Sequence, residues 1–242
     1  MLKIVIADSY DQVSEEAFKI MRQVVEKENP VLGLATGSTP VGLYKKMIAD
    51  HKTNGTSYKN AITFNLDEYV GLPRNHEQSY YTFMHDNLFN EIDVPEENIH
   101  IPNGEVADPE VECVRYESEM AKYVVDVQVL GIGSDGHIAF NEPGAAFDSL
   151  THTMELTEQT RKDNARFFDG DIDQVPTLAI TQGLGTIMRA KKIILIATGA
   201  NKADAVYGMI KGPKTTECPA SILQDHPDVT VILDEEAAAK IK

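Results

Sequence analysis

Short apolar runs alternate along this chain with longer amphipathic segments, and this alternation limits the fold more than any other feature. Uninterrupted apolar runs are typical of strands buried on both faces of a sheet, and here they lie at residues 2–7, 31–35, 61–66, 126–131, 192–198 and 229–233. The amphipathic segments between them predict helices at 11–28, 40–51, 78–90, 109–123 and 201–211. Strands that alternate with helices form a mostly parallel sheet with helices on both faces. We therefore predict a Rossmann-like α/β fold.

The 242 residues suffice for one such domain with a full core, and no repeat, low-complexity tract or Pro/Gly/Ser-rich linker divides them. We predict a single domain over residues 1–242. No stretch approaches the roughly 18 apolar residues that span a bilayer, and the first residues lack a secretory signal. Cys113 and Cys218 have no CxxC or Cys/His spacing, which favours free thiols in a reducing compartment. We expect a cytoplasmic protein with no membrane contact.

The balance of charge limits the partners. With 22 basic and 38 acidic residues the chain carries a formal charge of −16. Such a surface repels nucleic acids and anionic membranes, and we exclude both as partners. It also repels small anions, so a phosphorylated ligand requires a local cluster of basic side chains and backbone N–H donors.

Ligands of an open parallel sheet bind outside the carboxyl ends of its strands, so the residues that follow each strand deserve the closest reading. The strand at 31–35 leads into Thr36, Gly37, Ser38 and Thr39, and a helix is expected to begin at Pro40. Hydroxyls and the free N–H groups of a helix start suit a phosphate, although the GxxxxGK[ST] pattern is absent. A plain turn in which Thr39 caps the helix explains the same residues. Both interpretations remain open.

The strand at 61–66 leads into two adjacent acids, Asp67 and Glu68. Neighbouring side chains of an extended chain point to opposite sides, so one acid can face a site while the other faces away. An acid at this place can be a base, a metal ligand or a helix cap. Taken alone, the pair is explained as well by capping or solvation.

The strand at 126–131 leads into a glycine-rich stretch that holds Asp135, His137 and Glu142. A histidine among acids is the usual way to build a proton shuttle that works near neutral pH, and we predict a catalytic role for it. The glycines also match GxGxxG, but a dinucleotide loop opens a long helix. Here Pro143 and Gly144 follow within ten residues, so we reject that interpretation.

The same acids could alternatively bind a divalent cation. Asp67, Asp135, His137 and Glu142 together offer oxygen and nitrogen ligands. No HxH or HExxH spacing is present, and one histidine among acids fits a proton relay as well. We predict that no metal is bound.

Two basic residues stand out among many that are expected to be solvated. Lys202 follows the strand at 192–198 and a glycine turn, which places it at the same edge of the sheet as Thr36 and Thr39. Arg166 lies in the string TRKDNARFF. Both are candidates for neutralising an anion.

Taken together, these motifs resemble the glucosamine-6-phosphate deaminase family, whose members are aldose-ketose isomerases that also release ammonia. The resemblance extends in order over residues 32–202 and rests on the strings LGLATGSTP, TFNLDEYVGLP, SYYTFMH, GIGSDGHIAFNEPG, TRKDNARFF and ATGANK. The 6-phosphogluconolactonases are similar in the glycine-rich turn but lack NLDEY and FNEPG in this form.

The resemblance implies a reaction: α-D-glucosamine 6-phosphate and water give fructose 6-phosphate and ammonium. It implies that Asp67 moves a proton between C2 and C1, that His137 opens the pyranose ring, and that Asp135 and Glu142 hold His137. It implies no cofactor, and a lid at about 152–181 that excludes water. The phosphate would be bound by Thr36, Gly37, Ser38, Thr39, Arg166 and Lys202.

The chain departs from the allosteric, hexameric members of that family. Those enzymes carry basic residues shortly after FNEPG, where this chain has His152 and Met154, and Ala145 replaces a serine. We therefore expect a monomer that N-acetylglucosamine 6-phosphate does not activate. Two rival functions remain: a lactonase-like hydrolase in which His137 activates water, and a catalytically silent sugar-phosphate sensor.

Overall fold

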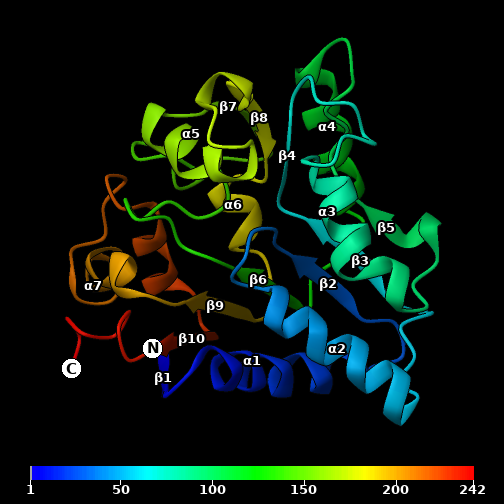
Figure 1. The fold of residues 1–242 in the computed structure, drawn as a ribbon, viewed down its shortest axis with the longest axis horizontal. Helices are drawn as coiled ribbons and strands as arrows, with labels where there is room; N and C mark the ends of the chain where they lie inside the picture. The colour runs from blue at the N-terminus through cyan, green and yellow to red at the C-terminus, as the bar shows by residue number, and fades with distance from the viewer. Residues whose placement is uncertain (1) are drawn as a thin grey trace.

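A seven-stranded parallel sheet forms the centre of the molecule (Figure 1). The computed structural model describes residues 2–242, and in it the strands lie in the order β1-β10-β9-β6-β2-β3-β5, with every neighbouring pair parallel. All six predicted strands form, which confirms the α/β prediction. The strands of this sheet are β1 Lys3–Ala7, β2 Val31–Leu34, β3 Ile62–Asn65, β5 Ile99–His100, β6 Val127–Leu130, β9 Ile193–Ala197 and β10 Val229–Asp234.

A second, three-stranded antiparallel sheet was not predicted. It has the order β4-β8-β7, formed by Asp67–Tyr69, Leu178–Thr181 and His152–Glu155. The two-residue edge strand β5 was also missed. Strands this short carry too few residues for an alternating pattern to show, and β7 is polar throughout much of its length. Because β7 and β8 bound the segment 152–181, both ends of the predicted lid are anchored in this small sheet.

The five predicted helices are present, and two short helices, α5 and α6, were not predicted. The α-helices are α1 Tyr10–Val25, α2 Val41–Asn54, α3 Tyr80–Asn87, α4 Pro109–Met120, α5 Glu158–Asn164, α6 Leu184–Ile187 and α7 Ala203–Lys211. The 3₁₀ helices are η1 Phe89–Glu91, η2 Glu96–Asn98, η3 Ala165–Phe167, η4 Ile172–Gln174, η5 Ala200–Lys202 and η6 Pro219–Asp225. Among the described residues, no helix combines the length and the apolar character needed to cross a bilayer.

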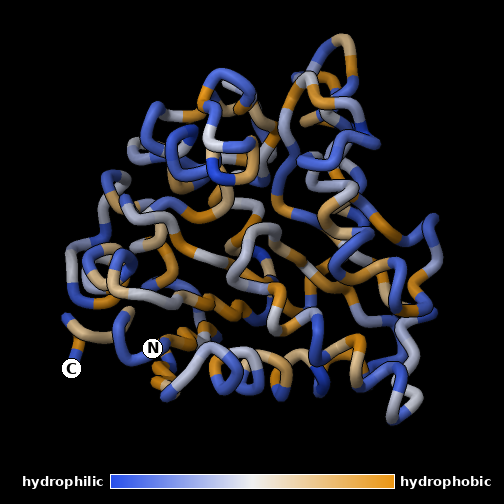
Figure 2. Tube along the Cα trace, in the orientation of Figure 1, coloured by the Kyte–Doolittle hydropathy of each residue, from blue (hydrophilic) through white to orange (hydrophobic). Residues whose placement is uncertain are grey.

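The helices cover both faces of the parallel sheet. α1 and α2 lie side by side (Figure 1), so closely that a Cβ atom on Gly42 would lie 2.1 Å from the Ser14 hydroxyl oxygen. α4 belongs to a connection that returns from the edge strand β5 to β6, and right-handed crossovers place it on the opposite face. There the Tyr116 ring packs edge-on against Phe64 of β3. The apolar runs thus become the buried middle layer, as the hydrophobic colour of the central strands shows (Figure 2).

A second, smaller hydrophobic cluster lies beside the main core. It joins the small sheet to the segment 152–181 and consists of Tyr69, Phe140, Leu156, Ala165, Phe168, Val175 and Ala179. The segment therefore packs on its own apolar contacts instead of lying loosely over the surface.

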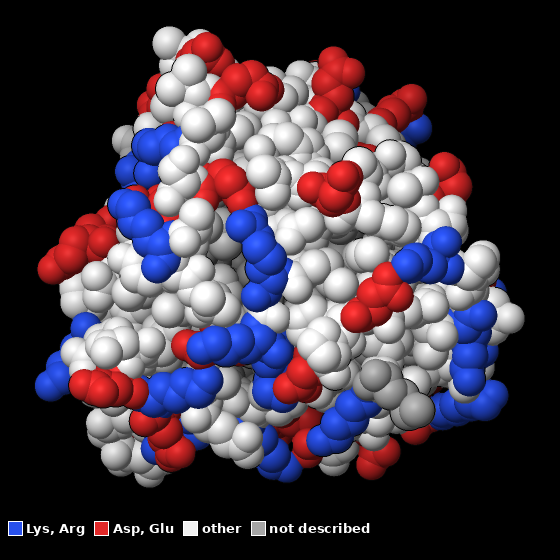
Figure 3. All heavy atoms as spheres, turned by 180° about the vertical axis from the view of Figure 1, so that it is seen from behind, with Lys and Arg blue, Asp and Glu red and all other residues white. Residues whose placement is uncertain are grey.

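The excess of acidic residues is not gathered into one continuous field on the face opposite to that of Figure 1. On that face, Lys and Arg side chains alternate with Asp and Glu (Figure 3). Elsewhere in the chain as well as on this face, basic groups form ion pairs; Lys27 and Lys191, for example, both lie within 3 Å of Asp126. Many of the basic side chains are thus engaged in ion pairs with neighbouring acids.

The order of the strands locates a binding crevice. From β2 the chain adds β3 and β5 on one side, and from β6 it adds β9 and β10 on the other. Such a reversal leaves a crevice at the carboxyl ends of the two strands where it occurs. The strands that precede the four predicted motifs, β9, β6, β2 and β3, are consecutive neighbours around this reversal.

Candidate active site

A cavity of about 580 Å³ lies at the carboxyl ends of these four strands. Loops from the parallel sheet form its floor, and α3 and the segment 152–181 form its walls. Eight of the ten predicted site residues line it: Thr36, Gly37, Ser38, Thr39, Asp67, His137, Arg166 and Lys202. The remaining two, Asp135 and Glu142, contact His137 from behind. The structure therefore brings the predicted residues together, although 166 positions separate the first from the last.

The loop after β2 does not have the features of a capped turn. α2 begins at Val41, and its N-cap, Pro40, provides no side-chain hydrogen bond. The expectation that Thr39 caps this helix is wrong, because the chain enters the helix one residue later than predicted. The hydroxyls before the helix are thus not used for capping. This outcome favours the phosphate interpretation.

A tyrosine that the sequence did not single out holds this loop from behind. The Tyr10 hydroxyl donates to the backbone oxygens of Ser38 and Thr39, at 2.9 and 3.0 Å, and accepts from the Gly42 N–H at 2.8 Å. Gly37 has φ +90°, a backbone conformation that favours glycine. The loop is thereby fixed with its other side toward the cavity.

The adjacent acids at the start of β4 point to opposite sides, as predicted. Asp67 lines the cavity and is only 6% exposed. Glu68 faces away and accepts the N–H groups of Tyr80 and Tyr81, each at 2.9 Å. These N–H groups are the first of α3, so Glu68 stabilises a helix start while Asp67 is left for chemistry.

Burial changes the proton affinity of both carboxyl groups. Burial raises the pKa of Asp67 to about 8, and the charge of Glu68 adds to the rise. Burial also raises the pKa of Glu68 to about 7, against its backbone hydrogen bonds and the charge of Arg74. A carboxyl group with a pKa near the operating pH can both accept and return a proton.

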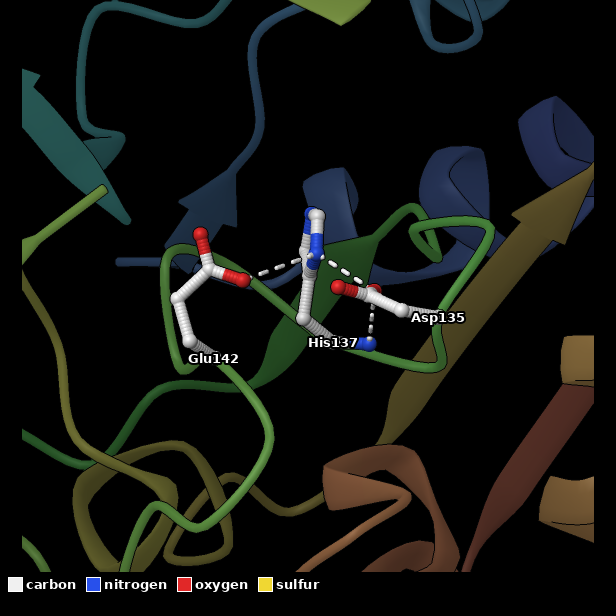
Figure 4. A group of neighbouring side chains, drawn as sticks. All are labelled: Asp135, His137 and Glu142. Carbon is white, nitrogen blue, oxygen red and sulfur yellow. Dashed lines mark hydrogen bonds and ion pairs between the residues drawn. The ribbon is translucent and has the colours of Figure 1, made fainter. Parts of the chain in front are cut away.

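His137 lies between the two other predicted acids (Figure 4). Its Nδ1 is 2.7 Å from Asp135 Oδ1 and 3.7 Å from Glu142 Oε2. The backbone N–H of His137 also donates to Asp135 Oδ1 at 3.1 Å. Because Nδ1 faces the acids, Nε2 on the other side of the ring is the nitrogen that can meet a ligand in the cavity.

The two acids are themselves held in place. Burial alone would raise the pKa of Asp135, but hydrogen bonding and the charge of His137 outweigh it and lower the pKa to about 2. Glu142 is 4% exposed, and its Oε1 accepts from the Thr157 N–H and hydroxyl at 3.2 and 3.3 Å. Thr157 is the N-cap of α5. The relay is therefore connected to the segment 152–181.

The same three groups satisfy the distances of a cation site. One atom from each of Asp135, His137 and Glu142 lies within 4.8 Å of the others, so geometry alone permits a divalent ion. Asp67 does not belong to this group. An imidazole nitrogen turned toward two carboxylates is equally the geometry of a proton relay, and the absence of a metal from the chemistry stays a prediction.

Glycines and backbone strain shape the loop that carries His137. A Cβ atom on Gly133 would lie 2.3 Å from Cε1 of the His137 ring, so this glycine makes room for the imidazole. A Cβ atom on Gly131 would meet no atom within 4 Å, and this residue lines the cavity. Ala139, also in the wall, has φ +51°, a strained conformation of the kind that clusters at functional sites.

Two cations enter the cavity from separate segments. Lys202 lies at the end of η5 after β9, and burial lowers its pKa in spite of the attraction of Asp163. Arg166 lies in η3, and its guanidinium is 4.7 Å above the Phe167 ring. Together with the loop after β2 they bring to one cavity the basic groups that an anion site in a negatively charged chain would need.

Several side chains of the site were missed. Tyr69, Tyr80 and Asn164 also line the cavity, and Asn141 fixes the turn after His137 through its side-chain donors to Ile138 O and Gln182 O. All four lie in strings already singled out, NLDEY, SYYTFMH, TRKDNARFF and FNEPG. Their position in those strings was the available signal, but none has the acid–base chemistry by which the other residues were chosen.

Fold and site together are typical of α/β enzymes that act on small phosphorylated ligands by acid–base chemistry. A family model described as glucosamine-6-phosphate isomerases/6-phosphogluconolactonase matches residues 7–232. The chain belongs to this family.

Several glucosamine-6-phosphate deaminases are similar to this chain over nearly its whole length. A glucosamine-6-phosphate deaminase of Thermoanaerobacter pseudethanolicus is 51% identical, with 99% of this chain and 95% of the relative covered. One of Halalkalibacterium halodurans is 48% identical over 99% of this chain and 98% of the relative. A solved structure described as a monomeric glucosamine-6-phosphate deaminase has a TM-score of 0.96 and 44% identity, covering 98% and 99% of the two chains.

The lactonase branch is more distant. The 6-phosphogluconolactonase of Trypanosoma brucei has a TM-score of 0.83 at 20% identity, covering 100% and 99% of the two chains. At that identity the likeness shows the shared fold alone. The deaminase relatives are therefore the ones that bear on function.

Proposed function

We propose that this chain is a glucosamine-6-phosphate deaminase, which converts glucosamine 6-phosphate and water to fructose 6-phosphate and ammonium. The observation that carries the proposal is the convergence of Asp67, His137 and an anion loop on one cavity, in a chain about half identical to enzymes of that name. A relay alone would serve many reactions. A buried carboxyl group that lines the same cavity adds a base for moving a carbon-bound proton.

The first step is opening of the sugar ring. Nε2 of His137 takes the proton of the C1 hydroxyl and returns one to the ring oxygen, so that the C1–O5 bond breaks and an aldehyde forms. The imidazole becomes transiently positive during this exchange, and the adjacent carboxylates of Asp135 and Glu142 stabilise that charge. The low pKa of Asp135 keeps it ionised for this role.

The second step moves a proton from C2 to C1. The ionised Asp67 removes the C2 proton while the C1 oxygen takes a proton from the substrate's own ammonium group, which gives an enediol-type intermediate with nitrogen on C2. The same carboxyl group then protonates C1, and the C1–C2 double bond is replaced by a double bond between C2 and nitrogen. Water adds to C2, and the C2–N bond breaks to leave the ketone and ammonia, which takes up the released proton as ammonium. Burial of Asp67 suits the step, since its raised pKa makes it a stronger base once ionised.

The phosphate is assigned to Thr36, Gly37, Ser38 and Thr39 with two cations, Arg166 and Lys202. Hydrogen bonds from charged donors to an anion are about twice as strong as neutral ones. The segment 152–181 then acts as a lid that keeps water from the intermediate until the sugar is seated. Arg166 belongs to that segment, so the phosphate would draw it toward the cavity.

The decisive experiment incubates the protein with glucosamine 6-phosphate and follows ammonium and fructose 6-phosphate separately. Equal amounts of both products are expected. Asp67→Asn should lower the rate by at least about a hundredfold, as loss of a general base does, while the exposed Asp86→Asn serves as the matched control. Retained ammonium release in Asp67→Asn would contradict the mechanism.

The rival functions predict other outcomes. A lactonase hydrolyses 6-phosphogluconolactone and leaves glucosamine 6-phosphate unchanged, and a sensor binds the sugar phosphate without forming product. Activity that is lost in a chelator and restored by a divalent ion would mean that Asp135, His137 and Glu142 hold a metal. We further propose a cytoplasmic monomer whose activity does not respond to N-acetylglucosamine 6-phosphate, which sedimentation and kinetics with that sugar test.

A further inference from the structure

A pair of tyrosine side chains lies between the segment 152–181 and the loop after β2. Tyr69 is the third residue of β4 and is 1% exposed, and Tyr80 is the first residue of α3. Their rings are 4.8 Å apart and their hydroxyl oxygens 3.3 Å apart. Both line the cavity, yet the mechanism above gives neither a task.

The hydroxyls of this pair connect two parts of the site that are far apart in the sequence. Asn164, at the end of α5, donates its amide N–H to the Tyr69 hydroxyl at 3.0 Å. On the other side, Tyr80 and Thr36 both line the cavity, and the Thr36 side chain is a polar neighbour of the Tyr80 hydroxyl. Two hydrogen bonds and this polar contact thus connect α5, through Tyr69 and Tyr80, to the loop that is assigned to the phosphate.

Apolar contacts support the same connection. The Tyr69 ring is 5.9 Å from the Phe168 ring of the segment 152–181 and 5.7 Å from the ring of Phe140, which lies in the loop that carries His137. Hydroxyls buried in such surroundings are costly to leave without partners, so a shift of one member of the chain favours a shift of the next. A buried polar network linked in this way has few alternative arrangements.

We propose that Tyr69 and Tyr80 are positioning residues that couple occupation of the phosphate loop to the placement of α5 over the cavity. The proposal rests on the proposed function only in taking the loop at Thr36 as the phosphate site. When a phosphate group binds the hydroxyls and N–H groups there, Thr36 is fixed, and through the two tyrosines Asn164 is fixed as well. α5 carries Lys162 and Asp163 into the cavity wall and leads directly into Arg166.

Tyr69→Phe and Tyr80→Phe test the proposal, because each removes one oxygen and keeps the ring. Loss of a buried hydrogen bond is expected to raise the KM for glucosamine 6-phosphate, and the Kd for inorganic phosphate, by about threefold to tenfold. The kcat should stay within about twofold, because neither hydroxyl is assigned to the reacting atoms. Tyr81→Phe is the matched control: it is the next residue of α3, and its hydroxyl bonds to Glu96 at 3.0 Å, outside the cavity.

A double-mutant cycle separates coupling from two independent losses. Asn164→Ala and Tyr69→Phe break the same hydrogen bond, so the double variant should bind inorganic phosphate no more than about twofold less tightly than the weaker single variant. Effects on Kd that multiply would overturn the proposal. Unchanged Kd in Tyr69→Phe, or equal changes in Tyr69→Phe and Tyr81→Phe, would overturn it too.

Hydrogen exchange supplies a readout that does not depend on turnover. Saturating inorganic phosphate should slow exchange of the α5 amides in the unmodified protein and should slow it much less in Tyr69→Phe, measured at equal occupancy. Phosphate binding without protection of α5 in the unmodified protein would refute the coupling. If protection is seen but no fructose 6-phosphate is formed, the coupling stands and the proposed reaction fails.

Discussion

Replacing the buried acid Asp67 with asparagine should make the protein more stable while it destroys activity. Burial raises the pKa of this carboxyl group from 3.8 to about 8, so the folded state holds the proton more tightly than the unfolded state does. Stability therefore falls as the pH rises through that window and is constant above it. Each pKa unit corresponds to about 1.36 kcal/mol, which gives a cost of about 2 kcal/mol at pH 5, about 4 at pH 7 and at most about 6 above pH 8.

Asparagine keeps the size and polarity of the side chain but cannot ionise, so Asp67→Asn should avoid this cost. The free energy of unfolding, measured in urea at pH 5, 7 and 9, should exceed that of the unmodified protein by an amount that grows with pH. A smaller fall should remain in the variant because Glu68 also has a raised pKa. Asp86→Asn, an exposed change on α3, should give a curve parallel to that of the unmodified protein.

Parallel curves for Asp67→Asn and the unmodified protein would refute the reasoning. They would mean that the folded state stabilises the charged carboxylate as well as water does, and the argument for a strengthened base would fail with it. A variant that is more stable and still active would separate the burial of Asp67 from its proposed role in catalysis.

Three further perturbations address other parts of the site. Because Asp67 must be ionised to act as base, kcat/KM should fall below a pH of about 8. The fall in kcat should come at a lower pH, because the ammonium group of the bound sugar favours the ionised carboxylate. Rates that stay constant from pH 6 to 9 would contradict this. Gly133→Ala should lower kcat/KM by about a hundredfold or more, because its Cβ atom would displace the His137 ring, whereas Gly131→Ala should change chiefly KM. Lys202→Met should raise KM by about tenfold or more through loss of a charged donor, and this loss should be smaller for a substrate analogue without the phosphate.

The sequence predicted the parallel sheet and the place of the site because both depend on long-range features of the pattern. Apolar runs long enough to be recognised became the strands, and parallel strands necessarily gather their carboxyl ends at one edge. The opposite orientations of Asp67 and Glu68 followed from the geometry of an extended chain. Asp67, Asp135, His137 and Glu142 could be selected from the sequence because few other residue types can exchange protons near neutral pH.

The antiparallel sheet and the tyrosine pair could not be predicted in this way. β4 and β7 are three and four residues long, and their pairing with β8 is decided by tertiary contacts. Tyr69 and Tyr80 belong to different elements, and nothing in their spacing shows that their hydroxyls meet. The start of α2 was placed one residue too early because Thr39 followed by Pro40 has the pattern of a cap, whereas Tyr10 from another helix holds that loop.

The short helix α5 has a greater part in the site than its seven residues suggest, because both of its ends are attached to functional groups. At its start, Thr157 donates to Glu142, which contacts His137. At its end, Asn164 donates to Tyr69, two residues from Asp67 on the same face of β4. A displacement of α5 therefore changes the surroundings of the ring-opening relay and of the isomerising base together. Both proton transfers thus share one supporting element, and α5 is the part of the segment 152–181 that contacts the neighbours of both reacting groups.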